Sequence, residues 1–590
     1  MRTSLVSQQS RWIDVALASG IMFVTGAIFL PFVTIGVELL HDGALFKPAL
    51  DVSRGATLFK DTFQHYGALT AYIQAFFLGA FGPTLKVLKM STLCFYLLSA
   101  GTLFMLWRTF LNRGLALASV VIWIMYASIY RDYATGPFKP WSSVYAIPFQ
   151  ALSLMFLLRA LQSSKSSHAT AHLFFSGVFT AAVFWVRSNV GVYHAGAMLV
   201  AFGIVFLPDK KTFSKKALCF IGGMALLHIV FFSHLYFSGS LGDWHEQIIQ
   251  WGREIARAAL QNISDFQIMI AVVVGTFEID AWGWKAWLLL AAILLPLRMV
   301  RGRGTSAWIL LAVGYGFALI GMFPYFPEWV RYPLEAPLRE GLKTSFPLLM
   351  LIATIGWLIS LFRTKGFGLS ERMVLAVIVV SLASFLQYMP VQNCDHHKFW
   401  AMAISIGPFV YLASQLTQDK GWPLLAALFV IMWPTLHTDI RFGYRKLTDP
   451  YVTLDRPRIL AGMRVTPKEA LAWKAIDDVI EPYYRAHPSG TGLLLGGDEI
   501  LAALAPHHRN AVSIYNYAPS EVRVNWHPDD DQKRVQFIRE TKPVIFLQVH
   551  DARTKGILEA VRDLNYKVVT TVPSFTPFSG WIEILLPHSS

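Results

Sequence analysis

Long apolar stretches recur along this chain and restrict it to folds that a lipid bilayer can hold. A helix that crosses a bilayer core of about 30 Å needs about 20 apolar residues. Charged residues make up 15% of the sequence, against about 25% in soluble proteins. The sequence therefore predicts a mostly α, polytopic membrane protein with about 13 transmembrane helices. The predicted spans are 13–36, 84–107, 114–129, 142–160, 171–186, 190–207, 217–237, 281–297, 306–324, 344–362, 372–389, 399–416 and 422–436.

The loops between these spans are of two kinds. If Arg2 and Arg11 are cytoplasmic, alternate loops are short and basic, as the positive-inside rule requires. The opposite loops are longer and mix acids, histidines, tryptophans and arginines. We therefore expect a multi-pass protein of the cell (inner) membrane with a cytoplasmic N-terminus and its chemistry on the outer side.

The net charge of +14 fits the same topology. Excess Lys and Arg in a multi-span protein reflects the positive-inside bias and attraction to anionic membrane lipids, so we expect no nucleic-acid partner. The three cysteines are Cys94 and Cys219, in apolar segments, and Cys394, in a loop. This distribution argues against a disulfide framework.

Hydropathy drops after Pro434 and the periodicity changes. Residues 467–486 have helical apolar spacing, and helix-like stretches follow at 530–541 and 553–564. Strands are predicted at 491–497, 511–517, 543–549, 566–572 and 581–587. Strands that alternate with helices favour a small α/β domain with a largely parallel sheet. We expect a membrane domain over 1–436 and, because the number of spans is odd, an extracytoplasmic soluble domain over 437–590.

The first outer loop, 38–82, carries more ionisable chemistry than a connection needs. It holds four acids, Arg54, and a short amphipathic run with Tyr66-Gly67 that returns the chain to the bilayer; the acids are Glu38, Asp42, Asp51 and Asp61. Ionisable residues at a membrane boundary are usually functional, although a solvated surface connection is the simpler alternative. Asp42, directly after the first span, could remove a proton from an incoming hydroxyl. Asp61 could assist it, bind a metal or hydrogen-bond an acceptor, whereas Asp51 could cap a helix or pair with Arg54.

Three further positions offer charge to a substrate. Asp395, His396, His397 and Lys398 precede a span, where a helix N-terminus favours phosphate; a metal site and interfacial snorkelling are the alternatives. Arg187 lies between two spans with almost no loop, so it could bind a donor phosphate or pair with an outer acid. Arg131 begins another outer loop and could bind substrate or form a local ion pair with Asp132.

The order of motifs in the first loop resembles the GT-C glycosyltransferase superfamily. The motifs are DGALF at 42–46, Arg54, LFKDTF at 58–63 and HYGAL at 65–69. The similarity is greatest to the bacterial branch related to the protein O-mannosyltransferases and the lipid A aminoarabinose transferase. Relatives often have Asp-Glu where this chain has Asp42-Gly43, which leaves the use of a divalent cation open.

The resemblance implies transfer of a sugar, a hexose or a pentose, from a polyprenyl-phosphate carrier to an extracytoplasmic glycan, lipid or protein. It implies that Asp42 is the catalytic base of an inverting displacement and Asp61 the second acid. Chemistry assigns the donor phosphate to Arg187, His396, His397 and Lys398, and substrate binding to Asp395 and Arg131. Arg54 and Tyr66, which lie in the motifs of the resemblance, are also expected to bind substrate. A transporter or flippase, a ligase or polymerase of lipid-linked glycans and a non-catalytic scaffold are the competing hypotheses; acids gathered at one surface and no visible repeat disfavour a transporter.

Overall fold

The structure of the protein is a computed structural model. It describes residues 8–38, 41–64, 66–126, 140–163, 165–250, 252–253, 350–351, 353–362, 368–386, 398–417, 449–495, 499–505, 530–548, 561–573 and 581–587. The predicted spans 281–297, 306–324 and 422–436 and the predicted strand 511–517 lie outside these residues.

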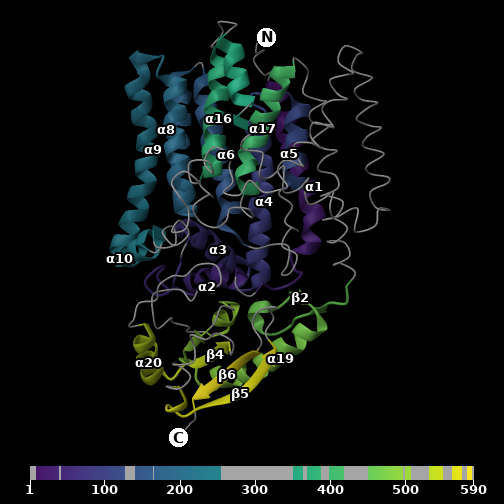
Figure 1. Ribbon diagram of the computed structural model, residues 1–590, viewed down its shortest axis with the longest axis vertical. Coiled ribbons are helices and arrows are strands. Elements are labelled where there is room, and N and C mark those ends of the chain that lie inside the picture. The colour runs from purple at the N-terminus through teal and green to yellow at the C-terminus, as the bar shows by residue number, and fades with distance from the viewer. Residues whose placement is uncertain are drawn as a thin grey trace.

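Long helices stand side by side in the upper part of the molecule (Figure 1). They are α1 (Gln8–Phe29), α4 (Leu85–Trp107), α5 (Arg113–Tyr126), α6 (Ser142–Gln162), α7 (Ser166–Val186), α8 (Ser188–Phe206), α9 (Lys210–Phe237), α16 (Leu369–Leu386) and α17 (Lys398–Thr417). Each overlaps a predicted span, and six of the described helices, including α1 extended to Phe32, are long and apolar enough to cross a membrane. The total of about 13 stays a prediction.

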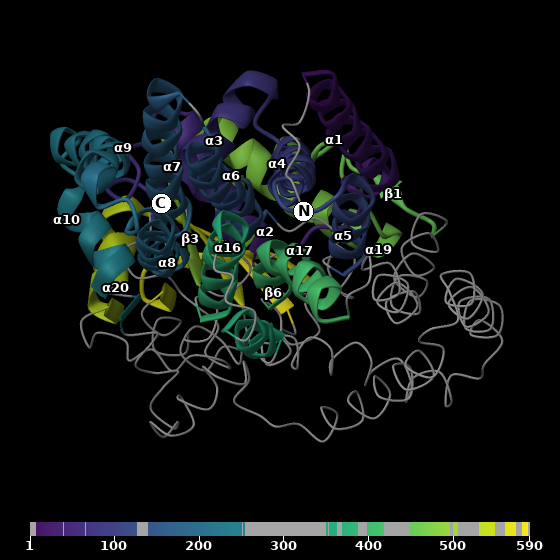
Figure 2. The ribbon, with the colours of Figure 1, turned by 90° about the horizontal axis from the view of Figure 1, so that it is seen from above.

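Among the described helices, α1 and α9 lie on opposite sides of the bundle (Figure 2). Both helices expose large apolar side chains, among them Phe23 on α1 and Leu218 and Phe237 on α9. In water such exposed apolar faces would promote aggregation, whereas in a bilayer they contact lipid tails that are equally apolar. The edges of the bundle therefore agree with a membrane-embedded body.

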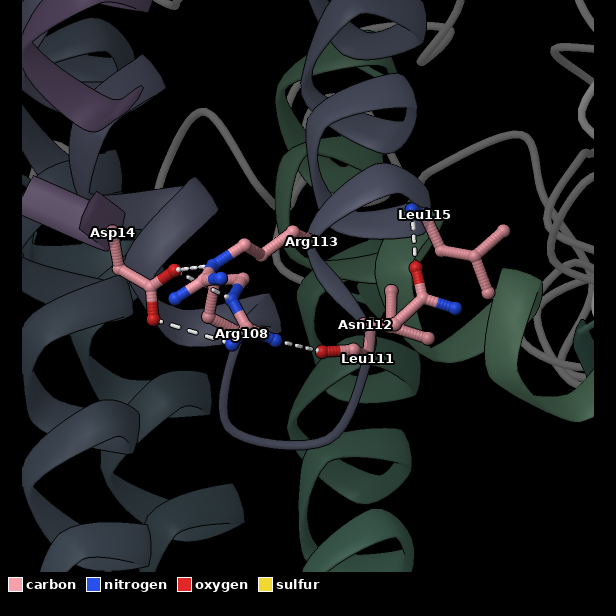
Figure 3. A network of polar contacts seen from close by, with 6 residues as sticks. All are labelled: Asp14, Arg108, Leu111, Asn112, Arg113 and Leu115. Carbon is pink, nitrogen blue, oxygen red and sulfur yellow. Dashed lines mark hydrogen bonds and ion pairs between the residues drawn. The ribbon is translucent and has the colours of Figure 1, made fainter. Parts of the chain in front are cut away.

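A charged cluster joins α1 to α4 and α5 (Figure 3). The carboxylate of Asp14 accepts hydrogen bonds from Arg108 Nε and Nη2, at 3.2 Å each, and from Arg113 Nε at 2.6 Å. Arg108 follows α4, and Arg113 begins α5. Asp14 is 6% exposed, so the three helices share one nearly buried carboxylate.

Asp14→Asn is expected to lower the free energy of unfolding by about 1.5–3 kcal/mol, because hydrogen bonds to charged groups contribute about that much. The unfolding midpoint in detergent measures the loss. Asp209→Asn is the matched control, since Asp209 lies 2.8 Å from Lys216 but is half exposed; exposed pairs contribute little. Equal midpoints for the two variants would contradict a structural role for the Asp14 cluster.

Two short helices lie between the bundle and the C-terminal sheet (Figure 1). They are α2 (His41–Ser53) and α3 (Ala68–Phe81), so the first outer loop holds two helices where the sequence predicts one short amphipathic run. The buried face of α2, with Phe46, Ala49 and Leu50, packs in one core with Ile500 and Leu501. The helix that contains the predicted catalytic acid is therefore packed between the bundle and the C-terminal residues.

The described C-terminal residues, 449–587, are called here the C-terminal unit. Its elements are β1 (Val452–Thr453), η5 (Arg458–Leu460), β2 (Arg464–Val465), α19 (Pro467–Ala486), β3 (Gly492–Leu495), η6 (Glu499–Leu504), α20 (Asp530–Thr541), β4 (Val544–Gln548), β5 (Tyr566–Pro573) and β6 (Trp581–Pro587). The bounds of α19 are those predicted from the sequence. The start of the helix follows from a capping box in which Thr466 and Glu469 satisfy each other's backbone N–H groups, with Pro467 as the first helical residue.

The main sheet has the order β3-β4-β6-β5. Among the described pairings of this sheet, β3 and β4 are parallel, while β4 pairs with β6 and β6 with β5 in antiparallel fashion. The prediction of a largely parallel sheet is therefore wrong for these strands. Only residues 574–580 separate β5 from β6, and a parallel neighbour needs a crossover of about a dozen residues.

Candidate functional site

Asp42 lies in the first turn of α2 and is completely buried. Its Oδ2 accepts a hydrogen bond from the backbone N–H of Glu38 at 2.9 Å, and its own N–H donates to Glu38 Oε2 at 3.3 Å. The two acids thus fix each other across the turn that leads into α2. An acid in the first turn is also favoured by the free N–H groups of the helix.

Lys89 on α4 provides the counter-charge, and sequence reasoning did not single it out. Its Nζ lies 2.8 Å from Asp42 Oδ2, and both side chains are at most 1% exposed. Nζ also donates to the carbonyl oxygen of Gly36 at 3.0 Å. The signal was present in the sequence, because a lysine inside a predicted span needs an anionic partner.

The electrostatics at Asp42 make it a stronger base than an exposed aspartate. Burial raises the pKa of the Asp42 carboxyl, Lys89 opposes the rise, and the nearby charge of Glu38 adds to it. The second oxygen, Oδ1, is buried and has no hydrogen-bond partner among the described residues. One oxygen of the carboxylate is therefore anchored while the other remains available to a proton.

Arg187 and Tyr66 form a second cluster. Arg187, 5% exposed, separates α7 from α8 and donates from Nη1 to the hydroxyls of Ser143 at 2.6 Å and Ser142 at 3.3 Å. Its guanidinium carbon lies 5.3 Å from the centroid of the Tyr66 ring. Burial raises the pKa of Tyr66 to about 12, against which Arg187 acts, so the phenol stays neutral. The predicted phosphate ligand and one predicted substrate ligand are thus brought together, at the N-termini of α6 and α8.

Because Gly67 has no side chain, the segment before α3 can approach the backbone at the end of α7 closely. The N–H of Gly67 donates to the carbonyl of Val186 at 3.2 Å, and Thr70 Oγ1 donates to the same oxygen at 2.8 Å. A Cβ at Gly67 would lie 2.1 Å from the carbonyl oxygen of Trp185. The Tyr-Gly pair therefore fits against the end of α7, which places Tyr66 beside Arg187.

The loop between α2 and α3 is fixed by a residue that the sequence did not reveal. Gln247, on the π-helical turn His245–Gln250, accepts from Gln64 N at 3.0 Å and donates to Phe59 O at 2.7 Å. The partners lie so far apart in the chain that no local pattern could join them.

Asp61, predicted as the second acid, occupies a different environment from Asp42. It is exposed, its N–H donates to Thr57 O at 2.9 Å, and its Oδ2 accepts from Thr57 N at 2.8 Å. This geometry closes a turn. Arg54 is also exposed, at the end of α2, and the described ion pair of Asp51 is with Lys47. The alternative pairing of Asp51 with Arg54 is thus not the salt bridge observed.

The remaining predicted residues fall largely outside the described structure. Arg131, Asp395, His396 and His397 lie outside the described residues, and Lys398 begins α17, as expected for a cluster at a helix N-terminus. No group of three or more His, Cys, Asp or Glu side chains suited to a metal occurs within the described ranges.

No protein-family model matches the chain, and no curated protein matches its sequence. Solved structures are similar to it at low identity. Archaeal oligosaccharyltransferase AglB from Archaeoglobus fulgidus, in complex with an inhibitory peptide and a dolichol-phosphate, matches with a TM-score of 0.50 and 12% identity over 98% of this chain and 74% of that chain. ArnT from Cupriavidus metallidurans, bound to undecaprenyl phosphate, matches with a TM-score of 0.48 and 12% identity over 98% of each chain. The likeness to AglB shows that this chain shares the fold of that structure, and the motifs of its first outer loop resemble the GT-C superfamily.

Proposed function

We propose that the chain is a membrane glycosyltransferase that moves a sugar, a hexose or a pentose, from a polyprenyl-phosphate carrier to an extracytoplasmic glycan, lipid or protein. The observation that carries the proposal is the Asp42 carboxylate, with one oxygen anchored by Lys89 and Glu38 and the other without a described partner. It lies in the loop whose motifs resemble GT-C enzymes, within the fold shared with AglB. The AglB structure that supports this fold holds a dolichol-phosphate and a peptide.

The proposed reaction is a single inverting displacement. Asp42 takes the proton of an acceptor hydroxyl, the hydroxyl oxygen bonds to the anomeric carbon, and the bond from that carbon to the carrier phosphate breaks. The electron pair leaves with the phosphate, whose growing charge Arg187, Lys398, His396 and His397 stabilise. Asp61, Arg54, Tyr66, Asp395 and Arg131 are proposed to orient the sugar or the acceptor.

Arg187 supports this assignment by its surroundings. It is nearly buried, its charge adds to the positive ends of α6 and α8, and its planar fork suits phosphate. The neutral Tyr66 ring holds the guanidinium from one side. Together these features favour an anion at the point where two helices begin.

The test uses purified full-length protein in nanodiscs with a panel of radiolabelled polyprenyl-phosphate sugars and a mixture of envelope acceptors. Release of free polyprenyl phosphate together with a labelled acceptor is the expected result. A flippase would instead move the intact labelled lipid between leaflets without cleaving it. That outcome would overturn the proposal.

Arg187→Gln is expected to raise the KM for the donor by about 10- to 100-fold, because a hydrogen bond to a charged group contributes about 1.5–3 kcal/mol. Arg187→Lys should recover little, since an ammonium cannot reproduce the planar guanidinium. In that group Nη1 donates to the hydroxyls of Ser142 and Ser143 while Nε donates to Asn189 Oδ1. Arg485→Gln, at an exposed arginine of α19, is the control. Donor titrations of the initial rate measure the effect, and an unchanged KM in Arg187→Gln would remove Arg187 from the donor site.

A further inference from the structure

A chain of hydrogen bonds connects the C-terminal unit to Asp42. The N–H of Arg464, on β2, donates to Thr34 O at 2.7 Å, and the N–H of Gly36 donates back to Arg464 O at 2.8 Å. The segment that leaves the first membrane helix is thus paired with a strand of the C-terminal unit. This pairing fixes the carbonyl of Gly36.

Lys89 continues the chain from that carbonyl to the acid. Its Nζ lies 3.0 Å from Gly36 O and 2.8 Å from Asp42 Oδ2. The side chains of Lys89 and Asp42 are almost completely buried, so the attraction between them is screened far less than at the surface. The buried Lys89 therefore has two fixed partners: the carbonyl oxygen of Gly36, in the segment paired with Arg464, and the carboxylate of Asp42.

We propose that Lys89 is a positioning residue that keeps Asp42 ionised and oriented, and that the C-terminal unit contributes to this role by fixing Gly36. The inference rests on the proposed function, because it assigns Asp42 the part of the base. It gives the C-terminal unit a task inside the site, independent of any acceptor that this unit binds. Lys89 and Glu38 hold Oδ2, which leaves Oδ1 as the oxygen that receives the proton.

The charged groups that face Asp42 determine how a substitution of Lys89 should change the pKa of the Asp42 carboxyl. Lys89 on α4 lowers the pKa of the Asp42 carboxyl, and Glu38, in the segment before α2, raises it beyond the effect of burial. Without the ammonium group, burial and the Glu38 charge both favour the protonated acid, and among the influences on this carboxyl only the hydrogen bond from the Glu38 N–H still opposes them. Removal of a neighbouring opposite charge raises a carboxyl pKa by about one to three pH units.

The first experiment follows the protonation of Asp42 by infrared spectroscopy of the full chain in nanodiscs. The carbonyl stretch of a protonated buried carboxyl is assigned to Asp42 by its loss in Asp42→Asn. In Lys89→Met the titration midpoint of this band should rise by about one to three pH units, whereas Lys89→Arg should remain near wild type. Lys89→Gln keeps a hydrogen-bond donor without the charge and carries the same expectation if Lys89→Met does not fold.

The same variants are then compared in sugar transfer across pH. Lys89→Met should move the acidic limb of the kcat/KM profile to higher pH by the shift seen in the infrared titration, with recovery of the lost rate at alkaline pH. A purely structural loss would lower the rate equally at every pH. An Asp42 midpoint that is the same in wild type, Lys89→Met and Lys89→Gln overturns the inference.

A matched pair of variants tests the contribution of the C-terminal unit. Arg464→Pro removes the N–H that binds Thr34 O, whereas Arg464→Ala removes only the side chain and keeps that hydrogen bond. We expect Arg464→Pro to shift the Asp42 midpoint upward and to reduce transfer about 3- to 10-fold, the effect of about one lost hydrogen bond. Arg464→Ala should resemble wild type. Equal behaviour of the two variants would show that the pairing of Arg464 with Thr34 and Gly36 does not help to position Asp42.

The two proposals fail in different ways. If the wild type cleaves no lipid-linked donor, the proposed function fails, while the infrared titration still decides whether Lys89 controls the ionisation of Asp42. If transfer is observed but the midpoint does not depend on Lys89, the function stands and the positioning role falls.

Discussion

Asp42→Asn is expected to reduce sugar transfer by about 10²- to 10⁴-fold, the contribution of a positioned general base. The amide keeps the shape of the side chain but cannot accept a proton at Oδ1, the oxygen without a described partner. Release of labelled polyprenyl phosphate and formation of labelled acceptor measure the loss. Donor binding should be nearly unchanged, because the donor phosphate is assigned to Arg187 and the residues near α17.

This variant also carries a stability effect that has to be separated from catalysis. Loss of the Asp42 charge leaves the Lys89 ammonium buried without its anion, and breaking a buried pair costs about 3–5 kcal/mol. The double variant Asp42→Asn/Lys89→Gln removes both charges and should recover most of the unfolding midpoint. It should not recover transfer. A double variant that is stable and transfers sugar at the wild-type rate would mean that the pair is only structural.

The bundle was predictable because its cause is local. Bilayer thickness fixes the length of each apolar stretch, so α4, α6, α7 and α8 begin and end within a few residues of the predicted spans. The first span is the exception, since the helix stops at Phe29 and a short 3-10 turn ends at Phe32. The predicted span continues to residue 36, but the structure pairs Thr34 and Gly36 with Arg464. No pattern near residue 34 indicates a partner so far along the chain.

The candidate site, like the fold, could be predicted from the sequence only in part. Asp42 stands out in the sequence because an acid at the end of a membrane span is energetically costly and is usually functional. The environment of Asp42 could not be predicted in this way, because its counter-charge comes from Lys89 on another helix. Asp61 has the same residue type and a similar loop position, yet it is exposed and closes a turn. Residue type and spacing therefore identify which acids to consider, whereas the burial and the partner charge that distinguish Asp42 from Asp61 depend on the packed fold.

Gly67→Ala is expected to have the second large effect, because the added methyl group has no space. Its Cβ would lie 2.1 Å from the carbonyl oxygen of Trp185 and 2.7 Å from the carbonyl carbon of Val186. Both obstacles are backbone atoms, so the start of α3 or the end of α7 must shift. Overpacking of this kind costs about 1–3 kcal/mol or more, which the unfolding midpoint in detergent should show.

The expected functional consequence follows from the position of Gly67 between Tyr66 and the end of α7, which leads to Arg187, the two residues proposed to form the anion site. Tyr66 directly precedes it, and Arg187 follows the obstructing carbonyls, so any shift that relieves the clash alters the 5.3 Å contact between ring and guanidinium. Donor KM should therefore rise at least 10-fold, in the same direction as in Arg187→Gln. Gly79→Ala is the matched control within α3, because a Cβ there meets nothing within 4 Å and alanine favours a helix by about 0.5–1 kcal/mol. If Gly67→Ala bound donor as tightly as Gly79→Ala, the close approach of α3 and α7 would have no part in shaping the site around Arg187.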